Sequence, residues 1–226
     1  MGMTLIVAHK SAGTLGFPSK MPGTSYGIPA SACLVGSKLA QIKGSVCEGC
    51  YAFGGNYQYP SVKTSHETRL ASIVNPQWVS AMVELLTRTH AKGVNRKGEK
   101  IASGWHRWHD SGDLQSENHL EKICAVATQT PHIRHWLPTR EHGIVSKFVK
   151  KGGIVPDNLT IRISATMVDG AATKQWPQTS GVHSFERHVS PMNEAQESTH
   201  ICPAPKQDNA CGSCRACWSR DVAHVS

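Results

Sequence analysis

The cysteines limit what this chain can fold into more than any other residue type. Near the end of the sequence Cys202 is followed by Pro203, and Cys211, Cys214 and Cys217 then follow one another with two residues between neighbours. Two intervening residues let successive thiolates converge on one metal centre. Three cysteines spaced in this way favour an iron-sulfur cluster over a zinc ribbon, whose ligands usually come as two separated pairs.

A second group of cysteines lies far upstream, where Cys33 precedes Cys47 and Cys50. The surrounding residues 11–60 are dominated by Gly, Ser, Pro and Tyr and show little periodicity. Irregular chain of this length needs a tether inside a compact protein, and metal coordination by the three cysteines would supply one. The alternative is that they are small buried hydrophobic residues. The spacing of Cys47 and Cys50 favours the metal.

Composition indicates an ordinary globular protein, since 39% of the 226 residues are hydrophobic and 18% are charged. We expect a single domain over residues 1–226, with an irregular region at 1–60, a core at 61–170 and a loop-rich region at 171–226. No run is long enough for a membrane helix, and the apolar start is too short for a signal peptide. The expected compartment is the cytoplasm, where thiols stay reduced and clustered cysteines are metal ligands before they are disulfides.

The core pattern predicts alternating strands and helices. One helix is expected to begin with Asn75 as its N-cap and Pro76 at its first position, after a shorter helix around Leu70. Ser116 is expected to cap another, on whose buried stripe Cys124 is a packing residue rather than a ligand. A short helix is expected at 144–149, and strands are expected at 4–9, 100–110, 135–139, 159–164 and 182–189. This succession is typical of parallel βα units and predicts an α/β fold.

Polar residues follow three successive strands of this pattern. Because the carboxyl ends of parallel strands meet at one rim, where α/β proteins bind ligands, these residues are candidates for binding a cofactor. The alternative is that the arginines only pair with acids of the rim. His106 and His109 lie on opposite faces of their strand and are not expected to share a metal. The candidates are Asp110, Gly112, Asp113, Arg140, Glu141, Arg162 and Ser164.

Several motifs together resemble the phage protein family called gene product 88. They are the stretches 29–33, 44–52, 108–115, 137–141 and 202–205, with the terminal cysteine triplet. The resemblance covers most of the chain and implies a bacteriophage setting, hence the cytoplasm of a bacterial host. It implies no particular reaction.

The layout is also similar to that of radical S-adenosylmethionine (SAM) enzymes, which carry an N-terminal three-cysteine loop and a glycine-and-acid motif at the end of the next strand. This resemblance implies a partial, open parallel βα barrel and a C-terminal auxiliary cluster. It further implies that Cys33, Cys47 and Cys50 hold a 4Fe-4S cluster whose open iron is chelated by SAM. Gly112 and Asp113 would meet the SAM amino group, and Arg162 or Ser164 its ribose. The family's cysteines are spaced by three and then two residues, whereas thirteen residues separate Cys33 from Cys47 here.

Three functions remain open on this basis. The first is a radical SAM-like enzyme acting on a small-molecule or macromolecular substrate at the rim. The second is a non-catalytic iron-sulfur protein with one or two clusters; a single four-cysteine site shared by both ends of the chain would make it structural. The third is a zinc-stapled protein that binds nucleic acid through its formal charge of +8. The densest basic run, at residues 92–100, is expected to be a solvated loop.

Overall fold

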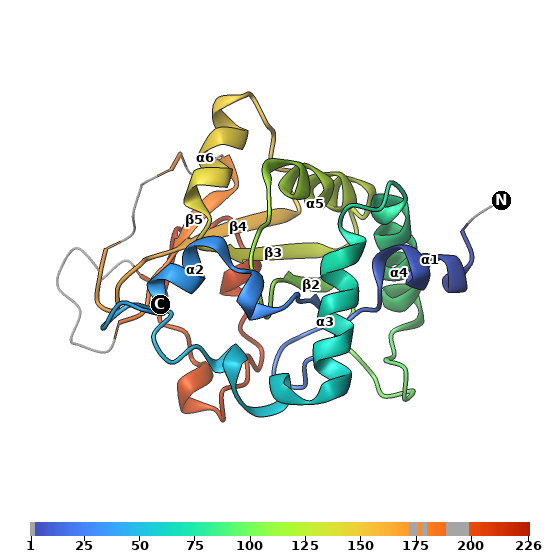
Figure 1. The fold of residues 1–226 in the computed structure, drawn as a ribbon, viewed down its shortest axis with the longest axis horizontal. Coiled ribbons are helices and arrows are strands. Elements are labelled where there is room, and N and C mark those ends of the chain that lie inside the picture. Colours follow the sequence, from blue (N-terminus) through green and yellow to red (C-terminus); the bar gives the residue numbers. More distant parts are fainter. Residues whose placement is uncertain (1–2, 172–175, 178–179, 189–198) are drawn as a thin grey trace.

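Six parallel strands form one open sheet, whose neighbours in space are also neighbours in the chain (Figure 1). The structure is a computed structural model and describes residues 3–171, 176–177, 180–188 and 199–226. An α/β fold with parallel strands is therefore confirmed. In spatial order the strands are β1 (Thr24–Tyr26), β2 (Trp105–Trp108), β3 (Arg134–Thr139), β4 (Leu159–Ser164), β5 (Val182–Phe185) and β6 (His224–Val225).

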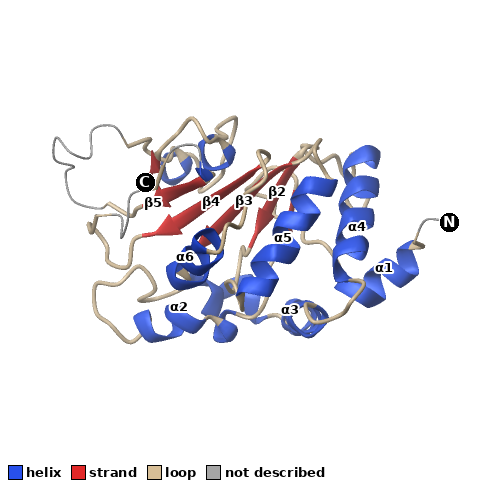
Figure 2. Ribbon diagram, turned by 90° about the horizontal axis from the view of Figure 1, so that it is seen from above, coloured by secondary structure: helices blue, strands red, loops and turns tan. Residues whose placement is uncertain are grey.

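Helices connect the first strands and pack together on one face of the sheet (Figure 2). Crossovers of one handedness between successive neighbouring strands must place their helices on the same face. The segment between β1 and β2 is the longest of these connections and also contains the first cysteine group. The helices are α1 (Leu5–Ala12), α2 (Leu34–Leu39), α3 (Pro60–Ser72), α4 (Trp78–Lys92), α5 (Glu117–Gln129) and α6 (His142–Lys150).

Helices α5 and α6 form where the sequence predicted helices, and local signals explain where α5 begins and α6 ends. The Ser116 side chain accepts a hydrogen bond from the backbone N–H of His119 and so caps the start of α5. The predicted stripe of α5 is buried, and Cys124 is only 7% exposed within it. Gly152, with φ of +84°, lies just beyond the end of α6, where a left-handed residue stops a helix at little cost.

The first predicted strand, at residues 4–9, is wrong: this stretch belongs to helix α1. Thr4 caps the helix by accepting a hydrogen bond from Val7, and Ala8, Ser11 and Ala12 are buried at helical spacing. A short apolar run does not distinguish a strand from a buried helical turn, and here tertiary packing decides. The first strand is instead β1, which the sequence analysis did not identify.

Other expected elements exist with different limits. Helix α4 begins at Trp78 rather than Pro76, because the Asn75 side chain accepts a hydrogen bond from the backbone N–H of Gln77 at 2.8 Å and forms a turn. The helix expected around Leu70 is the end of the longer α3. The strand expected at 100–110 is shortened to β2, and that expected at 182–189 is shortened to β5 within the described residues. β4 matches its prediction, and β3 begins one residue earlier than expected.

The two faces of the sheet differ in chemistry. Trp108, Leu137 and Ile161 belong to the hydrophobic core formed with the helices. The opposite face carries Arg107 and Trp136, which are paired across β2 and β3, and then Thr160 and Arg162 of β4. C-terminal residues cover this second face, and they include short 3-10 helices at Ala204–Lys206 and Ala216–Trp218. The side without crossover helices therefore combines polar and aromatic side chains and is closed by loops.

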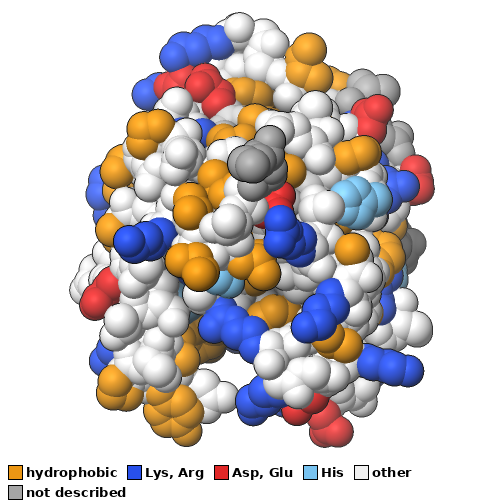
Figure 3. All heavy atoms as spheres, turned by 90° about the vertical axis from the view of Figure 1, so that its right-hand side faces the viewer, with side chains coloured by type: hydrophobic (Ala, Val, Ile, Leu, Met, Phe, Trp, Pro, Cys, Tyr) orange, Lys and Arg blue, Asp and Glu red, His pale blue; other side chains and the backbone are white. Residues whose placement is uncertain are grey.

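The loop at residues 92–100 is exposed apart from Gly93, Val94 and Asn95, in agreement with the expected solvated basic loop. On the face that carries α1, α3 and α4, lysine and arginine side chains are scattered among apolar and polar ones (Figure 3). Among the described residues, no helix has both the length and the hydropathy needed to cross a membrane.

Histidines form an unusual part of the buried core. The Thr24 hydroxyl forms one hydrogen bond with the His90 ring at 3.0 Å and another with the His106 ring at 2.8 Å. Burial lowers the pKa of His90 to about 4 and those of His119 and His135 to about 3. The folded structure therefore favours the neutral forms of these three histidines.

We predict that this protein loses stability in mild acid. A histidine whose folded pKa lies below 6.5 contributes its full stability above that value, and the contribution is lost as the pH falls toward the folded pKa. Asp113 acts in the opposite direction, because burial raises its pKa to about 6, but it is one group against several. The free energy of unfolding, measured with urea, should fall by at least about 2 kcal/mol from neutral pH to about pH 5. Equal stability at both pH values would contradict the prediction.

Candidate functional site

A cavity of about 1340 Å³ lies at the carboxyl ends of the strands. Its wall includes residues that directly follow β2 and β3, and Ser164 at the end of β4. Of the rim residues chosen from the sequence, Asp110, Gly112, Arg140 and Ser164 line this cavity. The structure thus brings these four candidates together around one space.

All three cysteines of the N-terminal group line the same cavity. A Cβ atom added to Gly36 would lie 3.6 Å from both the Cys33 and the Cys47 sulfur, so these two thiols approach the same turn of α2. The Ser45 hydroxyl fixes the second part of the loop by donating to the Leu39 carbonyl at 2.5 Å. It also accepts hydrogen bonds from the backbone N–H groups of residues 47 and 48. The irregular N-terminal loop is therefore organised around its cysteines.

Glu141 anchors this loop through hydrogen bonds at the start of α2. Its carboxylate accepts hydrogen bonds from the backbone N–H groups of Leu34 at 3.1 Å and Val35 at 2.7 Å, at the start of α2. The side chain is 3% exposed and does not line the cavity. It positions Cys33, which immediately precedes the helix, and its predicted contact with a cofactor stays a prediction.

Asp113 connects the ends of β2 and β3. Its carboxylate accepts hydrogen bonds from the Thr139 hydroxyl at 2.6 Å and from the backbone N–H groups of Arg140 and Leu114. It is 2% exposed and does not line the cavity. Asp113 therefore fixes the backbone that carries Arg140.

The guanidinium of Arg140 acts on two of the N-terminal thiols. Burial raises the pKa of Cys33 to about 12, an effect that Asp113 reinforces and Arg140 opposes. Burial also raises the pKa of Cys47, and Arg140 opposes this by its charge and by a hydrogen bond. Without a metal these thiols keep their protons at neutral pH, so binding a metal would release protons, and Arg140 would stabilise the resulting thiolates.

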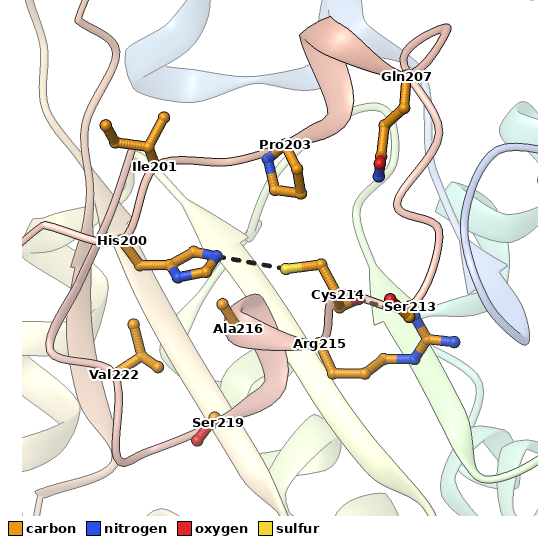
Figure 4. A pocket seen from close by; sticks show the side chains of 10 residues that line it. All are labelled: His200, Ile201, Pro203, Gln207, Ser213, Cys214, Arg215, Ala216, Ser219 and Val222. Carbon is orange, nitrogen blue, oxygen red and sulfur yellow. Dashed lines mark hydrogen bonds between the residues drawn. The ribbon is translucent and has the colours of Figure 1, made fainter.

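The C-terminal cysteines form a second group, of which Cys214 lines a smaller cavity of about 570 Å³ (Figure 4). Cys202, Cys211 and Cys217 interact electrostatically with one another, and burial raises the pKa of Cys217 to about 12. The sulfur of Cys214 points toward His200, whose Nε2 lies 3.3 Å away. All eight cysteines are free thiols.

Arg162 organises this second group from inside the sheet. The residue is fully buried, and its guanidinium donates to backbone carbonyls of the C-terminal segment and of β5. It does not line the large cavity, so its predicted contact with a cofactor also stays a prediction. Its acceptors are the carbonyl groups of Ser184, Ala216, Cys217, Ser219, Val222 and Ala223.

The two cysteine groups are separate, and none of the C-terminal cysteines lines the large cavity. Among thiols, Cys33 and Cys47 interact electrostatically only with members of the N-terminal group. The Cys211 N–H donates to the Lys20 carbonyl at 2.8 Å, which fastens the C-terminal loop to a residue of the cavity wall. Within the described residues, no three His, Cys, Asp or Glu side chains are grouped as the ligands of one metal ion.

Several cavity residues were not identified from the sequence. Arg107 alternates with Trp108 along β2, and this two-residue period would have placed it on the cavity side. Tyr51 directly follows Cys50 and forms an aromatic pair with Tyr57. His109 has φ of +53°, and both of its ring nitrogens are buried without a hydrogen-bond partner. No pattern in the sequence predicts that strained backbone.

We predict that Gly112→Ala severely destabilises the protein. Gly112 has φ of +75°, and an added Cβ would lie 2.3 Å from the Ile28 side chain and 2.8 Å from its carbonyl oxygen. Gly98→Ala is the matched control, because Gly98 has φ of +81° but open space around it. In urea unfolding, the control should lower the free energy of unfolding by about 1 kcal/mol, and Gly112→Ala should lower it by at least about 2 kcal/mol more. Equal losses would show that the close approach of Ile28 is unimportant.

We also predict that Arg162→Met loosens the C-terminal segment. Methionine has a similar length but leaves the buried carbonyl groups without donors, which should cost at least about 3 kcal/mol. Limited proteolysis should then cut between residues 200 and 226 at a higher rate than in the unchanged protein. Arg134→Met, at an exposed position of β3, should change stability by no more than about 0.5 kcal/mol. A stable, protease-resistant Arg162→Met variant would disprove the anchoring role.

Comparison with known proteins agrees with the motifs quoted above. No curated protein and no solved structure matches the chain. The family model described as gene product 88 matches residues 4–220, which is nearly the whole sequence. The chain therefore belongs to the gene product 88 family.

Proposed function

We propose that this protein is a two-cluster iron-sulfur enzyme of the radical SAM type. The observation that carries the proposal is the convergence of Cys33, Cys47 and Cys50 on a large cavity at the carboxyl ends of six parallel strands. Three thiols are the donor set of a 4Fe-4S cluster that keeps one iron open to another ligand. We further propose that the open sheet is a partial βα barrel, which the sequential strand order supports.

The cavity wall offers unpartnered polar atoms beside these thiols. Asp110 Oδ1, Ser111 Oγ and Arg140 Nε are buried and lack hydrogen-bond partners. A carboxylate and a hydroxyl suit the amino and ribose groups of SAM, and a guanidinium suits its carboxylate. We assign Asp110, Ser111 and Arg140 to this role, with Ser164 as a further wall residue. When bound, the cluster and SAM would supply reductive cleavage of a sulfonium and a radical that abstracts hydrogen from the substrate.

The residues of this chain would orient and shield that chemistry. Glu141 fixes the start of α2 and thereby Cys33, and Asp113 fixes the backbone of Arg140. Tyr51 donates a hydrogen bond to the Asp110 carbonyl at 2.6 Å, which ties the cysteine loop to the end of β2. These contacts hold the thiols and the polar wall in one relative position.

The C-terminal cysteines would hold the second cluster. Cys202, Cys211, Cys214 and Cys217 provide four thiols, the number that closes a 4Fe-4S site. Thiolates of such a cluster bind different irons and lie farther apart than the ligands of one zinc ion. The electrostatic separation of the two groups favours two clusters over one shared site.

The first experiment measures iron, zinc and acid-labile sulfide in protein purified without oxygen. We expect about eight iron and eight sulfide per chain. Cys47→Ala with Cys50→Ala, and separately Cys211→Ala with Cys214→Ala, should each remove about half. Cys124→Ala is the matched control and should remove none, because Cys124 lies in the packed stripe of α5.

Other results would contradict the proposal in different ways. Loss of all iron in both double variants would indicate one shared structural site. Zinc without sulfide would instead support the nucleic-acid-binding alternative. Far-ultraviolet circular dichroism of each variant would separate lost ligands from lost folding.

The second experiment tests SAM directly. After reduction, SAM should alter the electron paramagnetic resonance spectrum of the Cys211→Ala, Cys214→Ala variant, which keeps only the N-terminal cluster. The same addition should leave the spectrum of the Cys47→Ala, Cys50→Ala variant unchanged. If both clusters are present and SAM changes the spectrum of neither, the result would favour a non-catalytic iron-sulfur protein.

A further inference from the structure

The large cavity has a marked excess of positive charge. Its described wall contains the six cations Lys20, Arg69, Arg96, Arg107, Arg140 and Arg187, and as acids only Glu48 and Asp110. A 4Fe-4S core in its oxidised state, held by three thiolates, carries a net charge of about −1. SAM carries a net positive charge. With both groups bound, the cavity would therefore still favour an anionic third occupant.

Arg107 forms no ion pair within the described residues, although the Asp110 carboxylate acts on it electrostatically. Its guanidinium donates to the sulfur of Met21 at 2.9 Å and to the hydroxyl of Tyr51 at 3.3 Å, and its Nε is buried without a partner. It also stacks over the Trp136 ring at 4.5 Å. A thioether and a phenol are weak, neutral acceptors for a guanidinium. By contrast, Arg69 donates to the backbone carbonyls of residues 14 and 27 and so has a structural role.

Aromatic side chains stand beside these cations. Tyr51 and Phe53 line the cavity and are 59% and 54% exposed, so their ring surfaces are open to a ligand. Phe185 and Trp136 also line the cavity, with 6.3 Å between their ring centroids. Exposed aromatic rings next to unpaired guanidinium groups are the surface on which nucleotides bind, with bases stacked and phosphates paired.

We infer that the substrate of the proposed enzyme is a phosphate-bearing nucleotide, held by Arg107 at its phosphate and by Tyr51 and Phe53 at its base. This inference rests on the proposed function for its chemistry, but binding itself needs only the cavity. The nucleotide comes either free in solution or as one unit of a single strand. A volume of about 1340 Å³ exceeds the usual size of a pocket for one small ligand and leaves space beside a bound cofactor.

The test uses iron-loaded protein kept without oxygen and measures binding by isothermal titration calorimetry. The probes are the four deoxynucleoside 5′-monophosphates, the corresponding nucleosides, inorganic phosphate and a short single-stranded oligonucleotide. We expect at least one monophosphate to bind at least tenfold more tightly than its nucleoside, both with and without saturating SAM. An oligonucleotide that binds a hundredfold more tightly than any monophosphate would identify a strand as the source.

Variants locate the site. Arg107→Gln should weaken binding of the monophosphate at least tenfold, and Tyr51→Leu at least fivefold. Arg187→Gln, at an exposed position of the wall, should weaken binding even if Arg107→Gln fails to fold. Lys97→Gln is the matched control, because Lys97 is an exposed cation that does not line the cavity, and it should bind as the unchanged protein does.

Two results would overturn the inference. One is the absence of binding by any monophosphate or oligonucleotide below about 1 mM in protein that contains iron and binds SAM, which would leave the proposed function intact. The other is simple displacement of the nucleotide by SAM, because the site would then be the cofactor's own. Nucleotide binding that depends on Arg107, in protein that takes up no iron and no sulfide when purified without oxygen, would support the inference while contradicting the iron-sulfur proposal.

Discussion

The winding of the sheet in a single direction is the constraint on which the rest of the structure depends. Each new strand is added beside the previous one, so the crossover helices gather on one face and leave the other without helical cover. The helical face can be apolar, whereas the other face needs a different covering. Loops that carry cysteines provide it, and a cavity lies at the carboxyl ends of the strands.

Buried charge fixes those loops in place where regular secondary structure is scarce. Glu141 binds the start of α2, Asp113 binds the turn after β3, and Arg162 binds the carbonyl groups under the second cysteine group. Each of these side chains satisfies backbone groups that a loop would otherwise bury without partners. Glu141, Asp113 and Arg162 were predicted from the sequence to contact a ligand. In the structure they bind the backbone of the loops around the candidate site.

Local patterns predicted the middle of this fold better than its ends. Ser116, the stripe of α5 and the alternation of β4 carry their own signals, and these elements were found. β1 and β6 have three and two residues, too few for a period to be visible, and they exist only because the neighbouring strand pairs with them. Cysteine spacing likewise indicated the two groups, and the two-residue period of β2 carried the signal that would have placed Arg107 on the cavity side.

The anchoring of Arg162 also has a consequence for the order in which the molecule is made. Its guanidinium belongs to the middle of the chain, but most of its acceptors lie between residues 216 and 223. A nascent chain that has emerged only as far as β5 would leave this cation facing water on an uncovered sheet. This part of the sheet is therefore covered only after residues 216–223 have been made.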